Sequence, residues 1–266
     1  MGQANNTGRI VTKIAFRLKI MNIFHITYEP TYKTLDLHFW KCNLNCRGCY
    51  KRYEIYDLGL VANAIEKMNS KSLAKEPERF LSYDEVMKLT EGLEIKYAIF
   101  MGTEAAIDPE LPKLACALHK RNSSYNILLT NGLKITDMSD IDEVIFSLKA
   151  FSDDIHKEYT GKGNEKILKN FKKIYYGGKK LQAETVLIPE YIDSKEVEKL
   201  SRFVSGIDKD LTFRIIGYFP VPGCPWRAAT GEDVEKAAEL ARKYLNNVTC
   251  MISEMKGDNW KPKRIY

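Results

Sequence analysis

Short runs of apolar residues alternate along most of the chain with stretches in which apolar residues recur at helical spacing. Such runs are typical of buried strands, and the helical spacing is typical of amphipathic helices. We expect strands at 34–40, 97–101, 126–130, 143–149, 184–189 and 212–219. We expect helices at 83–93, 110–120, 164–176, 194–204 and 231–245.

This alternation predicts an α/β protein built from βα units around a parallel sheet. Six such units cannot close the usual eight-stranded barrel, so we expect a partial (β/α)6 TIM-like barrel. In such a sheet, ligands gather at the carboxyl ends of the strands. The loops after the first four predicted strands therefore mark the candidate site.

No internal repeat or low-complexity linker divides the chain, so we expect one domain over 21–266. Residues 1–20 are expected to form a tail that is disordered or left by an upstream start, with Met21 as the alternative start. Lysines and arginines interrupt the apolar segment that a signal peptide would need. No apolar run is long enough for a membrane-spanning helix, so we expect no membrane partner.

The net charge of +6 comes mainly from charges that alternate in sign, which indicates solvated helix faces. One stretch, 166–180, is strongly basic, and it fits a solvated helix better than a nucleic-acid surface. We therefore expect no nucleic-acid partner. Six cysteines at uneven spacing do not form a secreted disulfide framework, which favours a reducing, cytoplasmic location.

Three of these cysteines, Cys42, Cys46 and Cys49, lie in a C-x3-C-x2-C pattern directly after the first predicted strand. A structural zinc site takes four ligands, but the other cysteines are isolated and no two histidines have ligand spacing. A non-catalytic zinc-binding module is thus the weaker alternative. Three soft thiolates suit an iron–sulfur cluster that leaves one iron open to another molecule.

The cysteine pattern resembles the defining signature of the radical S-adenosylmethionine (radical SAM) superfamily. The resemblance implies that Cys42, Cys46 and Cys49 hold a [4Fe–4S] cluster, whose remaining iron takes the amino and carboxylate groups of S-adenosylmethionine. It also implies reductive cleavage to a 5′-deoxyadenosyl radical that removes hydrogen from a substrate. We accordingly expect an anaerobic oxidoreductase with flavodoxin or ferredoxin as electron donor.

Further motifs at the predicted strand ends resemble elements of the same superfamily: "CRGCY", "MGTEA", "TNG" and "SLKAF". By this resemblance Gly102 allows close approach of the methionine moiety, Glu104 holds its amino group, and Lys149 holds its carboxylate or the ribose. The cofactor-binding residues expected in these motifs are Tyr50, Gly102, Thr103, Glu104, Thr130, Asn131, Ser147 and Lys149.

The stretch 147–170 resembles pyruvate formate-lyase activating enzymes, which implies activation of a glycyl radical enzyme as protein partner. Leu129 and Ser147 stand where those enzymes carry acids that help bind a monovalent cation, so a cation site of that type is not expected. The alternative is a radical SAM enzyme acting on a small molecule, nucleoside or peptide by methylation, rearrangement or SAM lyase chemistry. Cys224 is left open as a ligand, a hydrogen donor or a residue without a role.

Overall fold

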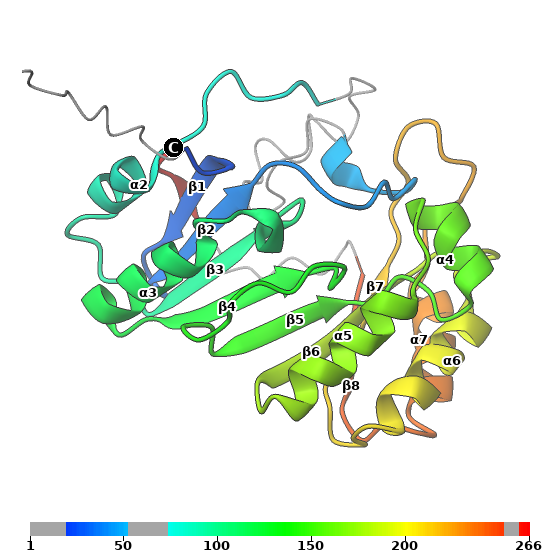
Figure 1. Cartoon of the computed structure of the whole chain (residues 1–266). Helices are drawn as coiled ribbons and strands as arrows, with labels where there is room; N and C mark the ends of the chain where they lie inside the picture. The colour runs from blue at the N-terminus through cyan, green and yellow to red at the C-terminus, as the bar shows by residue number, and fades with distance from the viewer. Residues whose placement is uncertain (1–19, 53–73, 253–260) are drawn as a thin grey trace, which may run out of the picture.

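The computed structural model describes residues 20–52, 74–252 and 261–266. Its strands form one nine-stranded sheet in the order β8-β7-β6-β5-β4-β3-β2-β1-β9 (Figure 1). The strands are β1 Ile23–Glu29, β2 Thr34–Phe39, β3 Tyr97–Gly102, β4 Tyr125–Thr130, β5 Glu143–Ser147, β6 Lys180–Leu187, β7 Phe213–Gly217, β8 Val248–Met251 and β9 Lys263–Arg264. Strands β2 to β8 run parallel, whereas β1 is antiparallel to both β2 and β9.

Helices separate most neighbouring parallel strands in the described ranges. They are α2 Tyr83–Leu89, α3 Leu111–Asn122, α4 Asp153–Thr160, α5 Glu165–Tyr176, α6 Ser194–Ser205 and α7 Gly231–Ala241, with single turns η1 Tyr50–Arg52 and η2 Ala105–Ile107. Successive parallel strands are neighbours in the sheet, as repeated βα crossovers of one hand require. The carboxyl ends of β2 to β7 therefore lie along one edge.

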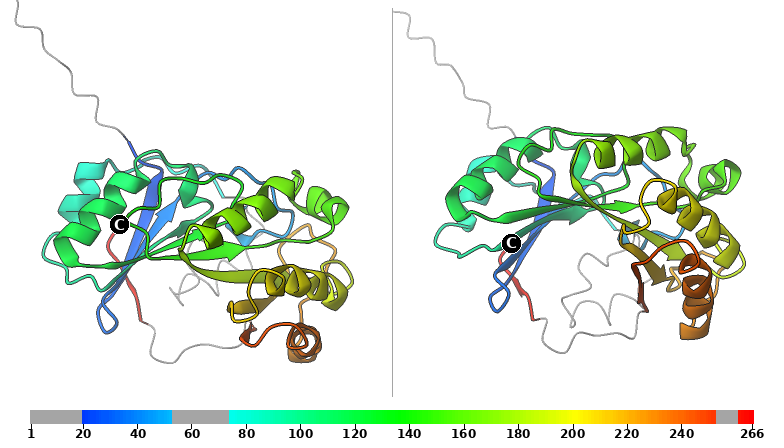
Figure 2. Two further views of the ribbon diagram at one scale, coloured as in Figure 1. Left: turned by 60° about the horizontal axis from the view of Figure 1, so that its bottom comes forward. Right: turned by 90° about the horizontal axis from the view of Figure 1, so that it is seen from below.

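The sheet is curved, and the helices lie along its outer face (Figure 2). Side chains alternate between the two faces of a strand, and one set, including Phe100, Phe146 and Phe213, is fully buried in the core beneath the helices. The other set is half-buried and forms what we call the inner face. Its apolar members are Ile99, Met101, Ile127, Leu129, Ile145, Val186 and Ile216. This is a partial barrel, so the expected α/β fold is confirmed.

The six expected strands correspond to β2 through β7, and the five expected helices to α2, α3, α5, α6 and α7. Strands β1, β8 and β9 and helix α4 were not predicted. The predicted tail lies largely outside the described residues. Within the described part of the chain, no helix has the length and apolar character that crossing a membrane requires.

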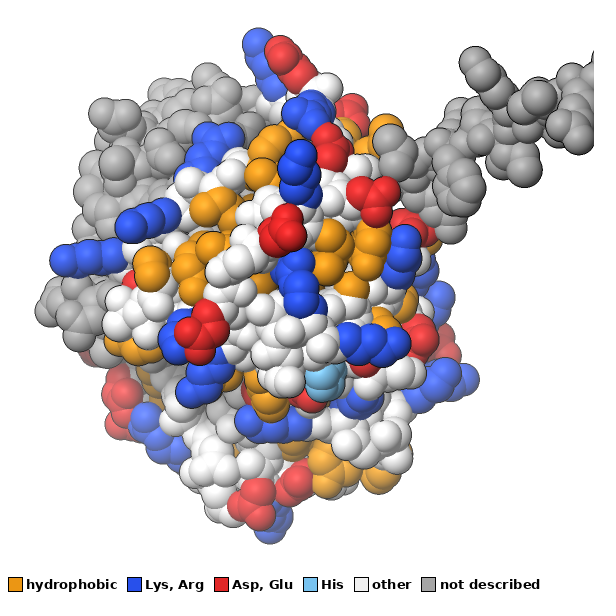
Figure 3. Space-filling model, turned by 90° about the vertical axis from the view of Figure 1, so that its left-hand side faces the viewer, with side chains coloured by type: hydrophobic (Ala, Val, Ile, Leu, Met, Phe, Trp, Pro, Cys, Tyr) orange, Lys and Arg blue, Asp and Glu red, His pale blue; other side chains and the backbone are white. Residues whose placement is uncertain are grey.

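On the face drawn in Figure 3, Lys and Arg side chains are interspersed with Asp and Glu. The basic stretch 166–180 is mostly α5, whose apolar side, Ile167, Phe171 and Ile174, is buried in the core. Its lysines therefore lie on the outward side of an amphipathic helix, as the sequence predicted.

Candidate active site

The cysteine loop, residues 40–49, leaves the carboxyl end of β2 and runs into η1. Thr103, just past β3, holds the first part of this loop. Its amide donates to the Phe39 carbonyl at 2.9 Å, and its hydroxyl donates to the Lys41 carbonyl at 2.5 Å. Thr103 thus fixes the backbone next to Cys42.

Gly102 ends β3 with a φ of +111°, a region that residues with a Cβ avoid. A Cβ at this position would lie only 2.4 Å from the Phe39 carbonyl oxygen. The close packing of β3 on β2 is sufficient to require glycine here. The close approach of a methionine moiety stays a prediction.

The second part of the cysteine loop rests on α4 and on the segment 218–227, which follows β7. Two loop amides donate to carbonyls near the carboxyl end of α4, at 2.8 and 2.9 Å. The Arg47 guanidinium pairs with Glu158 at 2.7 Å and lies over the Trp226 ring, 5.1 Å from its centroid. The loop is therefore anchored at both ends.

The thiols of Cys42, Cys46 and Cys49 are free; Cys42 is exposed and the other two are half-buried. Burial raises the pKa of Cys42 to about 11 and that of Cys46 to about 12, while the nearby Lys149 ammonium lowers both. Among the residues described, no three His, Cys, Asp or Glu side chains converge as ligands of a single metal ion. A cluster instead takes each thiolate on a different iron, so its ligands can stand farther apart. Three cysteine sulfurs that form no disulfide, carried on one anchored loop, are suitable ligands for such a cluster.

The loop after β7 brings Cys224 and Phe219 against the cysteine loop. The Cys224 thiol donates to the Arg47 carbonyl at 3.1 Å. Tyr50, at the start of η1, packs on Phe219 with ring centroids 5.6 Å apart. The structure thus gives Cys224 a contact that holds the loop, and Tyr50 an aromatic neighbour. Adenine contact by Tyr50 stays a prediction, as do the ligand and hydrogen-donor roles of Cys224.

Gly48 precedes the third cysteine and is surrounded by aromatic side chains. A Cβ there would lie 3.0 Å from both Tyr159 Oη and Tyr218 Cε2, and 3.4 Å from Trp226 Cζ3. We expect Gly48→Ala to lower the free energy of unfolding by about 1 kcal/mol, because the rings must shift to admit the methyl group. Urea denaturation measures this. Gly231→Ala, where the nearest atom is 4.0 Å away, is the matched control; equal stability of the two variants would contradict the packing argument.

Glu104 is buried, with 2% of its surface exposed. One carboxylate oxygen accepts from the Ala106 amide at 3.1 Å and the Thr130 hydroxyl at 2.7 Å, and the other accepts from the Asn131 amide at 2.7 Å. Burial raises the pKa of Glu104, and these hydrogen bonds oppose that rise. Glu104 therefore ties the end of β3 to the end of β4, and a contact with a cosubstrate amino group stays a prediction.

The Asn131 side chain continues this connection to the cysteine loop. Its amide nitrogen donates to Asn43 Oδ1 at 2.8 Å and lies 3.5 Å from Cys42 Sγ. Its oxygen accepts from the Leu133 amide at 2.9 Å. The motifs "MGTEA", "TNG" and the cysteine loop are thus joined by direct hydrogen bonds at the strand ends.

Ser147 and Lys149 lie at the carboxyl end of β5. The Ser147 hydroxyl donates to Glu184 Oε1 on β6 at 2.5 Å. Lys149 is half-buried, and within the described residues its ammonium makes no hydrogen bond or ion pair. Its positive charge lowers the pKa of both Cys42 and Cys46, against the larger effect of burial, which raises it. Lys149 is therefore a cation available to an anionic ligand.

We expect Lys149→Gln to weaken binding of S-adenosylmethionine about 10- to 150-fold, the equivalent of one charge-assisted hydrogen bond worth about 1.5–3 kcal/mol. Iron content and the free energy of unfolding should not change, because no protein partner loses a contact. Isothermal titration of the cluster-loaded protein measures the affinity, and Lys162→Gln, an exposed lysine on the loop after α4, is the control. Wild-type affinity in Lys149→Gln would contradict the assignment.

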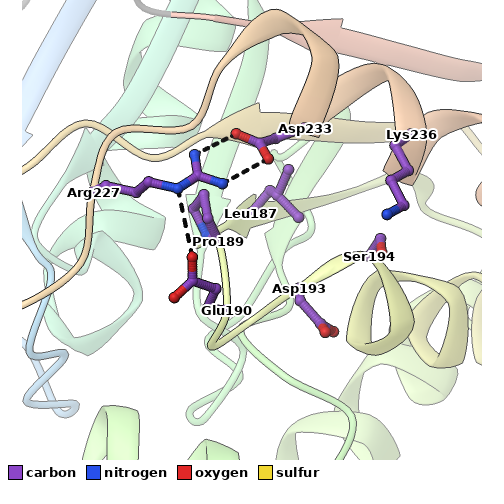
Figure 4. A pocket seen from close by; sticks show the side chains of 8 residues that line it. All are labelled: Leu187, Pro189, Glu190, Asp193, Ser194, Arg227, Asp233 and Lys236. Atoms are coloured by element: carbon purple, nitrogen blue, oxygen red, sulfur yellow. Dashed lines mark hydrogen bonds and ion pairs between the residues drawn. The ribbon is translucent and has the colours of Figure 1, made fainter.

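A separate pocket of about 230 Å³ lies at the amino-terminal ends of α6 and α7 (Figure 4). Its lining residues are Leu187, Pro189, Glu190, Asp193, Ser194, Arg227, Asp233 and Lys236. Arg227 donates to both carboxylate oxygens of Asp233, at 2.6 and 2.9 Å, and holds the pKa of Asp233 well below its usual range. None of the predicted site residues lines this pocket.

Four residues that shape the cysteine loop were not predicted: Asn43, Arg47, Tyr159 and Trp226. Asn43 and Arg47 lie inside the cysteine motif, and Trp226 lies in the "VPGCPW" segment. Their positions within or near quoted motifs were the available signal. Their contacts were not visible in the sequence, because they join segments far apart in the chain: Asn43 contacts Asn131, 88 positions away, and Arg47 contacts Glu158, 111 positions away.

Comparison with known proteins gives one family match. The family model described as the radical SAM superfamily matches residues 38–204, an interval that contains the cysteine loop and every predicted cofactor-binding residue.

Two curated relatives are similar in sequence. A Methanocaldococcus jannaschii protein with the provisional name glycyl-radical enzyme activating enzyme is 29% identical over 244 residues, which cover 88% of this chain and 85% of that protein. The pyruvate formate-lyase-activating enzyme of Staphylococcus aureus is 30% identical over 114 residues, which cover 40% of this chain and 45% of that enzyme.

Solved structures share the fold at low identity. A radical SAM methyltransferase from Sphaerobacter thermophilus matches with a TM-score of 0.56 and 14% identity, over 90% of this chain and 72% of that one. Streptococcus suis SuiB bound to S-adenosylmethionine matches with a TM-score of 0.55 and 14% identity, over 82% of this chain and 46% of that one. At these identities the similarity shows the partial-barrel fold alone.

Proposed function

We propose that this protein generates a glycyl radical on a partner protein. The premise is that the chain belongs to the radical SAM superfamily and is a radical SAM enzyme. The observation that carries this proposal is the similarity to the M. jannaschii protein named as a glycyl-radical enzyme activating enzyme, which extends over 88% of the chain. The resemblance of 147–170 to activating enzymes supports the same function. The family implies a [4Fe–4S] cluster and S-adenosylmethionine.

In this proposal Cys42, Cys46 and Cys49 are the cluster ligands, and Lys149 binds the carboxylate of S-adenosylmethionine. The remaining cofactor-binding residues are Tyr50, Gly102, Thr103, Glu104, Thr130, Asn131 and Ser147. When bound, the cluster supplies the electron for reductive cleavage of S-adenosylmethionine. The protein's own part is to bind, orient and shield the reacting groups.

The hydrogen bonds around the cysteine loop support this division of roles. Thr103 and Asn131 hold the loop at Cys42, and Arg47 holds it between Cys46 and Cys49. Such anchoring orders the loop that carries the thiols before any ligand binds, which lowers the entropic cost of binding. The apolar side chains of the inner face would keep water away from a reactive radical.

Electron paramagnetic resonance tests the proposed activity. The cluster-loaded protein is incubated anaerobically with a reductant, S-adenosylmethionine and a glycyl radical enzyme from the same organism. We expect a glycyl radical signal that requires S-adenosylmethionine and is absent with Cys42→Ala. Continued cleavage of S-adenosylmethionine without any glycyl radical signal on such partners would contradict the activating role.

A second candidate is a radical SAM enzyme acting on a small molecule, nucleoside or peptide by methylation, rearrangement or lyase chemistry. The observation favouring it is the absence of acids at Leu129 and Ser147. Leu129 belongs to the apolar inner face, and Ser147 is bonded to Glu184. In that case, the same incubation with small-molecule substrates would yield a modified product without a protein radical.

A further inference from the structure

The inner face carries a row of polar side chains that extends from Ser147 across two more strands. Strand pairing aligns Ser147 on β5 with Glu184 on β6, and Glu184 with Arg214 on β7. Side chains alternate along a strand, so all three point away from the helices. Apolar side chains flank the row: Ile145, Val186 and Ile216. The roles described above use neither Glu184 nor Arg214.

Glu184 and Arg214 are adjacent but only loosely paired. Glu184 Oε1 accepts from Ser147, whereas Oε2 lies 3.8 Å from Arg214 Nη1, too far for a hydrogen bond. Within the described chain, Arg214 donates no hydrogen bond, although its guanidinium has five N–H groups. The side chains of Glu184 and Arg214 are 13% and 30% exposed, so both are partly buried on the inner face. This spacing suits a third polar group placed between or over the pair.

We propose that Glu184 and Arg214 bind a main-chain amide of the substrate. The Arg214 guanidinium donates to the amide carbonyl, and the free Glu184 oxygen accepts from the amide N–H. An acid beside a base has no net charge, so it suits a neutral group with one donor and one acceptor better than it suits an ion. The flanking apolar side chains suit the small residues on either side of that amide.

The position of the row fits a substrate subsite. Ser147 is the last residue of β5 and lies two residues before Lys149 in the chain. Because Ser147 is aligned with Glu184, an amide on the Glu184–Arg214 pair would lie on the inner face, next to the carboxyl end of β5. This inference rests on the proposed function, because a main-chain amide reaches the inner face only if the substrate is the glycine-containing segment of a partner protein.

Calorimetry with a blocked peptide tests the inference without turnover. The probe is acetyl-Ala-Gly-Ala amide, titrated into cluster-loaded protein saturated with S-adenosylmethionine. We expect saturable binding of the peptide to the wild type. Its affinity for Arg214→Gln and for Glu184→Gln should be lower by about tenfold or more, because each variant loses one charge-assisted hydrogen bond. Glutamine keeps the size of the carboxylate and its hydrogen bond from Ser147.

The matched control is Arg202→Gln, which breaks an exposed Arg–Glu pair with Glu198 on α6. It should bind the peptide like the wild type. Affinity for S-adenosylmethionine should be unchanged in all three variants, which also shows that they are folded. No saturable binding to the wild type, or equal binding to Arg214→Gln and the wild type, overturns the inference. A parallel loss of S-adenosylmethionine affinity overturns it as well, because the pair would then serve the cosubstrate.

A second peptide tests the Glu184 contact. This peptide carries N-methylglycine in place of the central glycine, so it lacks the glycine N–H. Its affinity for the wild-type protein should therefore be as low as the affinity of the glycine peptide for the Glu184→Gln variant. Equal affinity of both peptides for the wild type contradicts the contact. Deuterium at the glycine α-carbon, followed into 5′-deoxyadenosine by mass spectrometry, reports the proposed function separately. Binding without deuterium transfer would leave the subsite standing and count against activation.

Discussion

Replacing Cys42, Cys46 and Cys49 together with alanine is expected to abolish iron binding. Protein reconstituted anaerobically with iron and sulfide should hold about four irons per chain and absorb broadly in the visible, because three thiolates ligate one cluster. The triple variant has none of these ligands, and the described ranges contain no group of three or more His, Cys, Asp or Glu side chains that could hold a metal ion in their place. Iron analysis and the visible spectrum measure the loss.

The controls are Cys116→Ala on α3 and Cys250→Ala on β8, which should keep the full iron content. Wild-type iron content in the triple variant would contradict the assignment of the ligands. Colourless protein that holds zinc after the same treatment would favour the zinc-binding module.

Glu104→Ala is expected to lower the free energy of unfolding by about 3 kcal/mol or more. The substitution removes the acceptor of three donors, the Ala106 and Asn131 amides and the Thr130 hydroxyl, and leaving a buried donor unpaired costs about 1–3 kcal/mol. In a protein of this size each kcal/mol lowers Tm by about 2–4 °C. A fall in Tm of about 6–12 °C should follow, together with weaker retention of the cluster, because Asn131 contacts Cys42.

Glu91→Ala, an exposed glutamate just past α2, is the control and should leave Tm unchanged. A Glu104→Ala variant with wild-type Tm that lost only its affinity for S-adenosylmethionine would contradict the structural role. Such a result would mean that Glu104 serves only to bind S-adenosylmethionine. The comparison with Lys149→Gln is informative, since that variant should change affinity without changing stability.

The parallel strands were predictable because their buried faces are apolar runs, as in "YAIFM" and "NILLT". Strand β1 was missed because His25 and Thr27, though buried, interrupt its apolar pattern. Helix α4 was missed for a related reason: its buried residues are His156, Tyr159 and Thr160, which leave no apolar stripe for periodicity to detect. Strands β8 and β9 are short and largely exposed, so pairing with neighbours rather than composition defines them.

The location of the candidate site was predictable because parallel strands end at a common edge, which brings their following loops together. The hydrogen-bond partners of each side chain could not be predicted. Glu104 could be expected to contact a ligand, but its hydrogen bonds to Thr130 and Asn131 depend on how β3 and β4 are aligned. Likewise, the contact of Arg47 with Trp226 joins residues about 180 positions apart, and only the closed fold specifies it.

The most direct test of the central claim is product analysis after reduction. Cluster-loaded wild-type protein is incubated anaerobically with dithionite and S-adenosylmethionine, and the products are separated by chromatography. The site built from Cys42, Cys46, Cys49 and Lys149 predicts 5′-deoxyadenosine and methionine in equal amounts, with none from the triple cysteine variant. Methylthioadenosine as the sole nucleoside product, or 5′-deoxyadenosine formed equally well by the triple variant, would contradict it.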